Sequence, residues 1–472
     1  MKKLLFEGIT LPEYTLSERL IQEAHRMLLS VGTWCSTVLC LLIISVLAGF
    51  MEKAGSNEPD ALNFYIPLTY SVGLSMLITA PLNGLLSHRL AEELWKKNYA
   101  PLVNSLNAAL TVLLPSIFIL AFLMHQKWAS SQVVGQGVIF AVLTTSMSAL
   151  WICNNVMTLL HKDYGVIITF MLGLFLAILG TSLISDQLQG EGVLGVLSLG
   201  FTLTAFLQYG YIIKKYKNDW INPCYKFIRV NKENLMVFLF FIFFNFGMWI
   251  DKILYWFVDD SNNKLIGVLG EKKGVEDLFF HYSDYDYPFF VVFTLFAISQ
   301  FLILRKLKEL LKKPQQGFSD GLFLNLPFKY LDKEKNNLIL GYRKIMYSLF
   351  SIYGSIILII SFSVSVDMIP LPWDNPYVFH ILLISTLILG IFFLNLIILQ
   401  YTDQYKPVAL LCGFFLLTNG LGTFLTIKLY PDLQGLGFLI ASLSTAVFSS
   451  IYVERILGRW EYVVIKNIAN NF

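Results

Sequence analysis

Residues 377–399 read YVFHILLISTLILGIFFLNLIIL, a run without Asp, Glu, Lys or Arg. An α-helix needs about 20 apolar residues to cross the ~30 Å hydrocarbon core of a bilayer, so this run predicts a membrane-spanning helix. Similar runs recur about a dozen times between Leu28 and Val453. With 56% hydrophobic and 14% charged residues and a mean hydropathy of +0.63, the chain is predicted to be an all-α polytopic membrane protein.

The apolar runs predict twelve transmembrane helices in two sets of six. The first set covers residues 28–51, 62–86, 102–124, 133–157, 164–184 and 192–213. The second set covers residues 235–258, 287–304, 345–366, 377–399, 407–427 and 436–453. We therefore expect two six-helix lobes, 28–217 and 235–454, joined by a linker at 218–234 and followed by a tail at 455–472. Each lobe would begin and end on the same side of the membrane, as in parallel repeats.

The first 27 residues lack an apolar core of their own, so residues 1–27 are not a cleaved signal peptide. Leu16, Leu20, Ile21, Ala24 and Met27 have helical spacing, which predicts an amphipathic helix on the membrane surface. An ordinary solvent-facing turn before the first span is the alternative.

Basic residues are distributed unevenly between the predicted loops. The termini and the even-numbered loops hold 28 of the 35 lysines and arginines. Because positive charge is retained on the cytoplasmic side, both termini are predicted to be cytoplasmic.

Motifs that carry catalysis are missing from the sequence. Residues 267–274 (GVLGEKKG) have the wrong order for a phosphate-binding loop, and the six histidines are scattered. None of the five cysteines has metal-ligand spacing. We therefore expect no enzyme activity, no cofactor and no metal, and no basic tract indicates nucleic-acid binding.

The seventh predicted span contains NFGMWIDKILYWF at 245–257, which places Asp251 and Lys252 inside the membrane. Each such charge costs about 2.5–3.5 kcal/mol at the bilayer centre on insertion scales, so it needs a function or a partner. Adjacent residues point about 100° apart on a helix, so we do not expect these two to pair with each other. Asp251 is instead expected to be functional or to belong to another buried pair.

One face of the same span carries four residues that suit a sugar-lined path. They are Asn245, Trp249, Lys252 and Trp256. Flat indoles can stack on pyranose rings while the polar groups bond hydroxyls. Alternatively, Lys252 and the tryptophans extend to the outer interface as membrane anchors.

The second predicted span carries a polar stripe at successive i+4 positions: Ser71, Ser75, Thr79 and Asn83. The stripe either lines a cavity or mediates close helix packing. Pro67 and Pro81 in the same span would permit bending. Asn419 is one further polar residue inside a predicted span, in the eleventh.

Several segments together resemble one protein family. The segments are SVGTW at 30–34, YSVGLSMLITAPLNGLLSHRLAEEL at 70–94, WIDKILYWF at 249–257, DYDYPFF at 284–290, LQYTDQYKPVAL at 399–410 and GRWEYVVI at 458–465. Asn419, Thr423, Gly435, Gly437 and Phe438 also follow in the family's order. The chain thus resembles the PelG-type transporters of Pel exopolysaccharide systems, within the multidrug/oligosaccharidyl-lipid/polysaccharide (MOP) flippase superfamily.

The resemblance implies two six-helix lobes around a central cavity, in the inner membrane of a bacterium. It also implies export of a biofilm exopolysaccharide, or its precursor, from the cytoplasm outward. It implies partners as well: a cytoplasmic glycosyltransferase and companion membrane subunits of the synthase complex. Among family positions it marks Arg89, Glu92 and Asp403 at the cytoplasmic side. The expected pathway residues are Asn245, Trp249, Asp251, Lys252, Trp256, Ser75, Thr79, Asn83 and Asn419. Two alternatives remain: a cation-coupled exporter of small molecules, and a scaffold that anchors the synthase without transport.

Overall fold

The computed structural model describes most of the two predicted helix sets. The described residues are 58–95, 97–128, 134–160, 163–184, 190–216, 224–228, 232–258, 285–286, 288–293, 296, 327–366, 376–402 and 404–462. The predicted amphipathic helix at 1–27 and the first span lie outside these residues, and the eighth span is described only in part.

The described part of the chain consists of long α-helices and one short 3-10 helix, without strands. The first helices are α2 (Glu58–Trp95), α3 (Ala100–Trp128), α4 (Val134–Leu159), α5 (Asp163–Ile184) and α6 (Gly190–Tyr216). The 3-10 helix η1 (Tyr225–Ile228) precedes α7 (Lys232–Val258). The later helices are α10 (Phe328–Ser365), α11 (Pro376–Tyr401), α12 (Tyr405–Leu429) and α13 (Leu436–Gly458). Within the described residues, 8 helices are long and apolar enough to cross a membrane.

Most helices agree with the predicted spans to within a few residues, and α4 and α5 separate where the sequence predicts. The clear exceptions are α2, which continues to Trp95 although its predicted span ends at 86, and α10, which begins at Phe328 although the apolar run begins at 345. The 38 residues of α10 correspond to about 57 Å at 1.5 Å per residue, well beyond the ~30 Å hydrocarbon core. Hydropathy detects only the part of a helix that lies in lipid, so the polar extension of α10 was missed.

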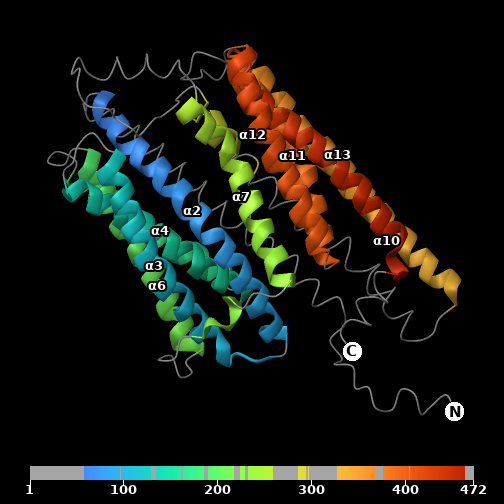
Figure 1. Ribbon diagram of the computed structural model, residues 1–472, viewed down its shortest axis with the longest axis horizontal. Coiled ribbons are helices and arrows are strands. Elements are labelled where there is room, and N and C mark those ends of the chain that lie inside the picture. Colours follow the sequence, from blue (N-terminus) through green and yellow to red (C-terminus); the bar gives the residue numbers. More distant parts are fainter. Residues whose placement is uncertain are drawn as a thin grey trace.

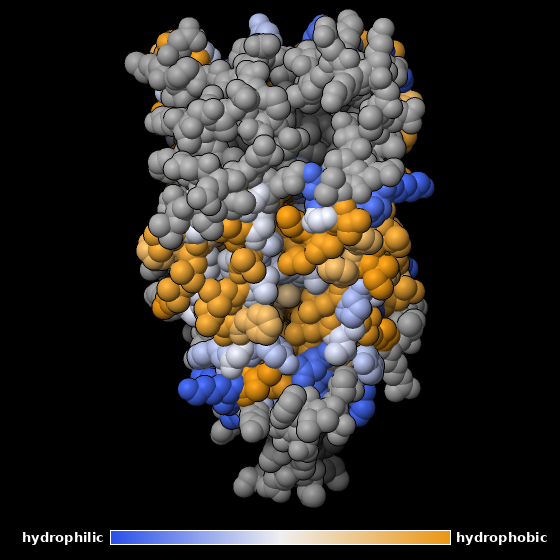
Figure 2. Space-filling view, turned by 90° about the vertical axis from the view of Figure 1, so that its left-hand side faces the viewer, coloured by the Kyte–Doolittle hydropathy of each residue, from blue (hydrophilic) through white to orange (hydrophobic). Residues whose placement is uncertain are grey.

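The helices form two groups that meet mainly where α2 packs on α7. In the first group α2 packs on α3 and α4, and α4 packs on α6. In the second group α7 packs on α12, while α13 packs on α11 and α12. Figure 1 shows α2 beside α7 in the middle of the molecule, and extensive contact between the groups is made by this pair. In Figure 2 apolar residues form a belt with polar residues at its borders, as expected for a protein surrounded by lipid.

Close backbone approach holds neighbouring helices of the second group together. Gly437 of α13 lies directly against the backbone of Gly422 and Thr423 of α12, with no room for a side chain. Small residues at such crossings are typical of membrane helices, where close packing replaces the hydrophobic driving force. Gly435, which precedes α13, has a φ of 87°, a conformation that glycine adopts at little cost.

Candidate functional site

Asp251 and Lys252 form a buried ion pair on α7. The Lys252 Nζ lies 3.1 Å from Asp251 Oδ1 and 3.3 Å from Oδ2. Both residues are fully buried. The expectation that these neighbours would not pair is therefore wrong. The long lysine stem lets the ammonium turn back, where it also donates to the Met248 carbonyl at 3.0 Å.

The ammonium of Lys252 has an aromatic neighbour as well. Its Nζ lies 3.0 Å from the centroid of the Phe289 ring. An ammonium over a ring face is attracted by the ring quadrupole, most strongly where water is absent. In this structure Lys252 therefore does not extend to the membrane interface, and the anchor interpretation is wrong for this residue.

Two residues that the sequence did not single out complete the charged cluster. The Tyr285 hydroxyl donates to Asp251 Oδ2 at 2.5 Å, and Asp286 accepts a hydrogen bond from Trp256 Nε1 at 2.8 Å. Both are buried, in the described part of the eighth span's entry. Both residues lie in the Asp-Tyr-Asp-Tyr-Pro sequence at 284–288, which contributes to the family resemblance but predicts no role for either of them.

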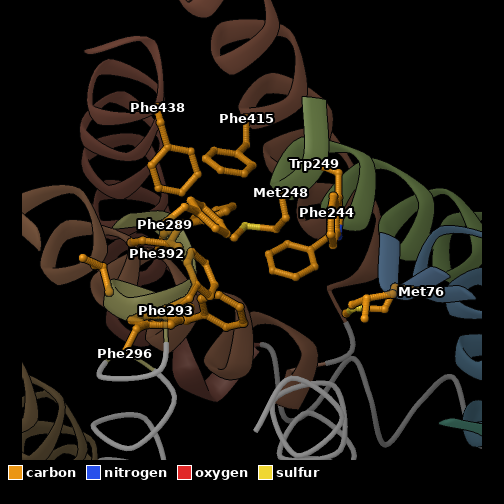
Figure 3. Packing of buried hydrophobic residues seen from close by; sticks show 14 of the residues in the cluster. Met76, Phe244, Met248, Trp249, Phe289, Phe293, Phe296, Phe392, Phe415 and Phe438 are labelled. Carbon is orange, nitrogen blue, oxygen red and sulfur yellow. The ribbon is translucent and has the colours of Figure 1, made fainter. Parts of the chain in front are cut away.

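The surface where α2 meets α7 is rich in aromatic rings, and we call it the α2–α7 seam. Tyr70 of α2 stacks on Trp256 of α7 with ring centroids 4.6 Å apart. One turn further, Trp249 lies flat against Gly73, where an added Cβ would be 3.0 Å from Trp249 Cζ3. Figure 3 shows Trp249 and Met248 leaving α7 in different directions, with Met248 toward the phenylalanines of the second group.

The seam is also closed at its other end. An added Cβ on Gly84 of α2 would lie 2.7 Å from Cγ of Phe241 on α7. Beyond it, His88 of α2 packs edge-on against Tyr405 at the start of α12, with ring centroids 5.4 Å apart. The two groups are thus in contact both at the Val258 end of α7 and toward its Lys232 end.

Among the predicted pathway residues on α2, two bond α4 and one bonds its own helix. Ser75 accepts a hydrogen bond from Trp151 Nε1 at 3.0 Å, and Asn83 accepts one from Asn155 at 3.2 Å through its carbonyl. Thr79 bonds the Ser75 carbonyl of its own helix. Of the two interpretations of this stripe, the contacts in this structure match helix packing.

Asn419 and Asn245 also make contacts inside the second group. The Asn419 side chain donates to the Gly247 carbonyl at 2.8 Å and accepts from Thr423 at 3.2 Å, which ties α12 to α7. Asn245 is buried and donates to the Phe241 carbonyl of its own helix at 2.8 Å.

Of the family positions, Arg89 is paired on the surface of α2. Its guanidinium lies 2.6 Å from Glu93, one turn along the helix. Asp403 and the side chain of Glu92 lie outside the described residues.

The cluster offers groups for polar recognition of a ligand. Within the described residues, no group of three or more His, Cys, Asp or Glu could hold a metal ion. The available groups are one ammonium, two carboxylates, indole and phenol hydrogen-bonding groups, and broad aromatic faces at the seam. Such a set can bind a polar cargo that has flat apolar faces.

Comparison with known proteins identifies a family. The family model PelG, described as "Putative exopolysaccharide Exporter (EPS-E)", matches residues 12–464. No curated protein matches the chain.

Solved structures share the fold at low sequence identity. A MATE protein in complex with MaL6 has a TM-score of 0.58 at 10% identity, covering 97% of this chain and 99% of that one. An outward-facing MATE multidrug resistance transporter of the MOP superfamily has 0.57 at 11%, with the same coverage. A MOP superfamily transporter from Pyrococcus furiosus has 0.52 at 11%, covering 96% and 98%. At such identities the likeness establishes the fold alone.

Proposed function

The chain belongs to the PelG exopolysaccharide exporter family and has the fold of MOP-superfamily transporters, and from this premise we propose that it carries a Pel-like exopolysaccharide, or its precursor, from the cytoplasm outward. The path would open between the two groups of helices, along the α2–α7 seam. The protein would act as a transporter without catalysing a reaction itself.

The observation that carries the proposal is the composition of the seam. Tyr70, Trp249 and Trp256 place three large rings where the two groups meet, with the Asp251–Lys252 pair directly behind them. Aromatic side chains give a sugar ring a flat apolar surface together with a polar edge. An interface built only to hold two helix groups together needs neither buried charge nor a row of rings.

The residues proposed to meet the cargo are fewer than the sequence suggested. Trp249 and Trp256 lie on the seam, and Asp251 and Lys252 lie behind them. We leave Ser75, Thr79, Asn83 and Asn419 out of the proposed path, because their hydrogen bonds lie within one helix group or the other. We place Asn245 at the edge of the proposed path, since among the described contacts its side chain bonds only its own helix.

The setting of the transporter follows from charge and family. We propose two lobes, 28–217 and 235–454, in the inner membrane, with the Lys232 end of α7 toward the cytoplasm because the basic residues gather there. A cytoplasmic glycosyltransferase and companion membrane subunits would deliver the polymer to that end. The family description supports an export role, and these partners extend it.

A disulfide across the seam tests the path. Cysteines at Gly84 and Phe241 face each other closely enough for a disulfide, given the 2.7 Å between an ideal Gly84 Cβ and Phe241 Cγ. We expect the double variant Gly84→Cys/Phe241→Cys to stop polymer secretion when oxidised and to recover when reduced, because the seam can no longer open. Secreted polymer is measured in cells whose native cysteines in this protein are replaced by alanine.

The single variants Gly84→Cys and Phe241→Cys serve as matched controls, since each changes the packing without forming the crosslink. Secretion that continues through a fully formed crosslink would contradict a path along this seam.

A further inference from the structure

We infer that Tyr70, Trp249 and Trp256 form a binding site for one pyranose ring of the cargo, which we call the ring site. The inference rests on the proposed function and gives it a specific location at the Val258 end of the seam. It assigns Tyr70 a role that the sequence did not suggest.

The geometry of the three rings supports such a site. Tyr70 and Trp256 stack at 4.6 Å with an interplanar angle of 27°, and they come from opposite sides of the seam. Trp249 and Trp256 lie 6.2 Å apart at 55°, so the second indole closes one side at an angle. When the two groups of helices separate, the stacked pair opens into two facing aromatic surfaces that a flat ring can fill.

The indole N–H of Trp249 supports binding of a polar ligand at the ring site. Trp249 is only 2% exposed, and its indole N–H has no hydrogen-bond partner among the described residues. Buried N–H groups are nearly always bonded, because leaving one unpaired costs most of its hydration free energy. A sugar hydroxyl or ring oxygen is an acceptor that would satisfy this donor while the ring stacks beside it.

The surroundings hold the ring site in shape. The Trp256 indole is fixed by its 2.8 Å hydrogen bond to Asp286, so that ring is oriented before any cargo arrives. Gly73 provides no side chain opposite Trp249, and any Cβ there would contact the indole. The ligand class that fits is a hydroxylated six-membered ring with an apolar face, and a long alkyl chain would leave the indole N–H unsatisfied.

The test measures binding of defined oligosaccharides to the full-length protein. The protein is placed in nanodiscs of phosphatidylethanolamine and phosphatidylglycerol, so that no glycosidic detergent competes. A β-1,4-linked N-acetylglucosamine tetramer and maltotetraose are titrated separately by calorimetry. We expect at least one tetramer to bind, and Trp249→Phe, which keeps a ring but removes the N–H, to weaken it by about tenfold, as for one lost hydrogen bond.

Two further variants keep the result interpretable. Gly73→Leu places a bulky side chain directly against Trp249 and is expected to reduce binding by more than Trp249→Phe does. Trp460→Phe changes a buried tryptophan beyond α13, away from the seam, and should leave binding unchanged. Thermal unfolding identifies any variant that fails to fold, and Tyr70→Leu then replaces it as the test of the ring site.

Different experimental results would contradict the ring site and the proposed path. If neither tetramer binds the wild-type protein, or if folded Trp249→Phe and Gly73→Leu bind as the wild type does, the ring site is wrong. The Gly84–Phe241 disulfide would still block secretion in that case if the path is right. A disulfide that has no effect on secretion contradicts the path itself.

Discussion

The contacts between α2, α4 and α6 bury amides and hydroxyls, whereas α7 buries an ammonium and a carboxylate. In the first group Asn155 bonds Ser87 and Asn83, and Gln208 bonds Asn154 at 2.7 Å. In the second group Asp251 and Lys252 are held together and bonded further by Tyr285.

This difference indicates where a charged side chain can be buried in the helix bundle. A neutral amide in a helix contact needs one or two hydrogen bonds, and a neighbouring helix provides them. A buried charge needs a counter-charge, because the desolvation cost of either ion alone is several kcal/mol. The charged cluster is therefore the more demanding structure, and it lies beside the seam where a cargo would pass.

The largest expected effect comes from breaking the ion pair. Lys252→Met or Asp251→Asn alone should destabilise the protein by about 3–5 kcal/mol, because each leaves its partner charged and buried without compensation. The change is measured as the loss of folded protein and the fall in unfolding temperature of the purified variants in one detergent.

The double variant Asp251→Asn/Lys252→Met is the matched control. Since it removes both charges, most of the stability should return, as for other buried pairs replaced together. If the double variant folds but does not secrete polymer, the pair acts on the cargo. Full secretion by the double variant would leave the pair a purely structural role, and equal instability of the double and single variants would contradict the pairing.

Removing a buried amide in the first group should lower the stability less than breaking the Asp251–Lys252 pair. Asn155→Ala removes the partner of Ser87 and Asn83 without leaving a charge, so about 1–3 kcal/mol of stability should be lost. Unfolding temperatures measured beside those of the α7 variants give the comparison directly. Ser116→Ala is the control, because this exposed hydroxyl bonds the Val112 carbonyl of its own helix. A larger loss for Asn155→Ala than for Lys252→Met would reverse the ranking of the two groups.

Hydropathy predicted the long helices well because crossing lipid requires a continuous apolar run. It also identified α7 as unusual, since Asp251 and Lys252 interrupt such a run. The pairing of these two could not be deduced from helix geometry alone. Their Cα–Cβ directions diverge, and the contact depends on the flexible lysine stem and on the Met248 carbonyl, which a backbone periodicity does not describe.

The roles of Tyr285 and Trp151 could not be predicted from the sequence, for a different reason. Tyr285 reaches Asp251 across 34 residues, and Trp151 reaches Ser75 across 76. Such contacts depend on which helix faces which, and a single sequence does not fix helix rotation. The polar stripe on α2 is an example, because its spacing was correctly recognised but its neighbour, α4, was not predicted.

The smallest expected effect concerns a second ion pair, which lies at the protein surface. Arg89 and Glu93 form an ion pair at 2.6 Å, but the Arg89 side chain is 38% exposed, whereas Lys252 is buried. Water and salt screen such a pair, so Arg89→Gln should change stability by only about 0.2–1 kcal/mol. Glu93 keeps its hydrogen bond from Asn98 at 2.8 Å in this variant, which limits the loss further. Unfolding temperatures at low and high salt provide the measurement, and the small difference from wild type should shrink as salt rises. A loss comparable to that of Lys252→Met would show that burial is not what distinguishes the two ion pairs, and the contrast between the two groups of helices would then need another cause.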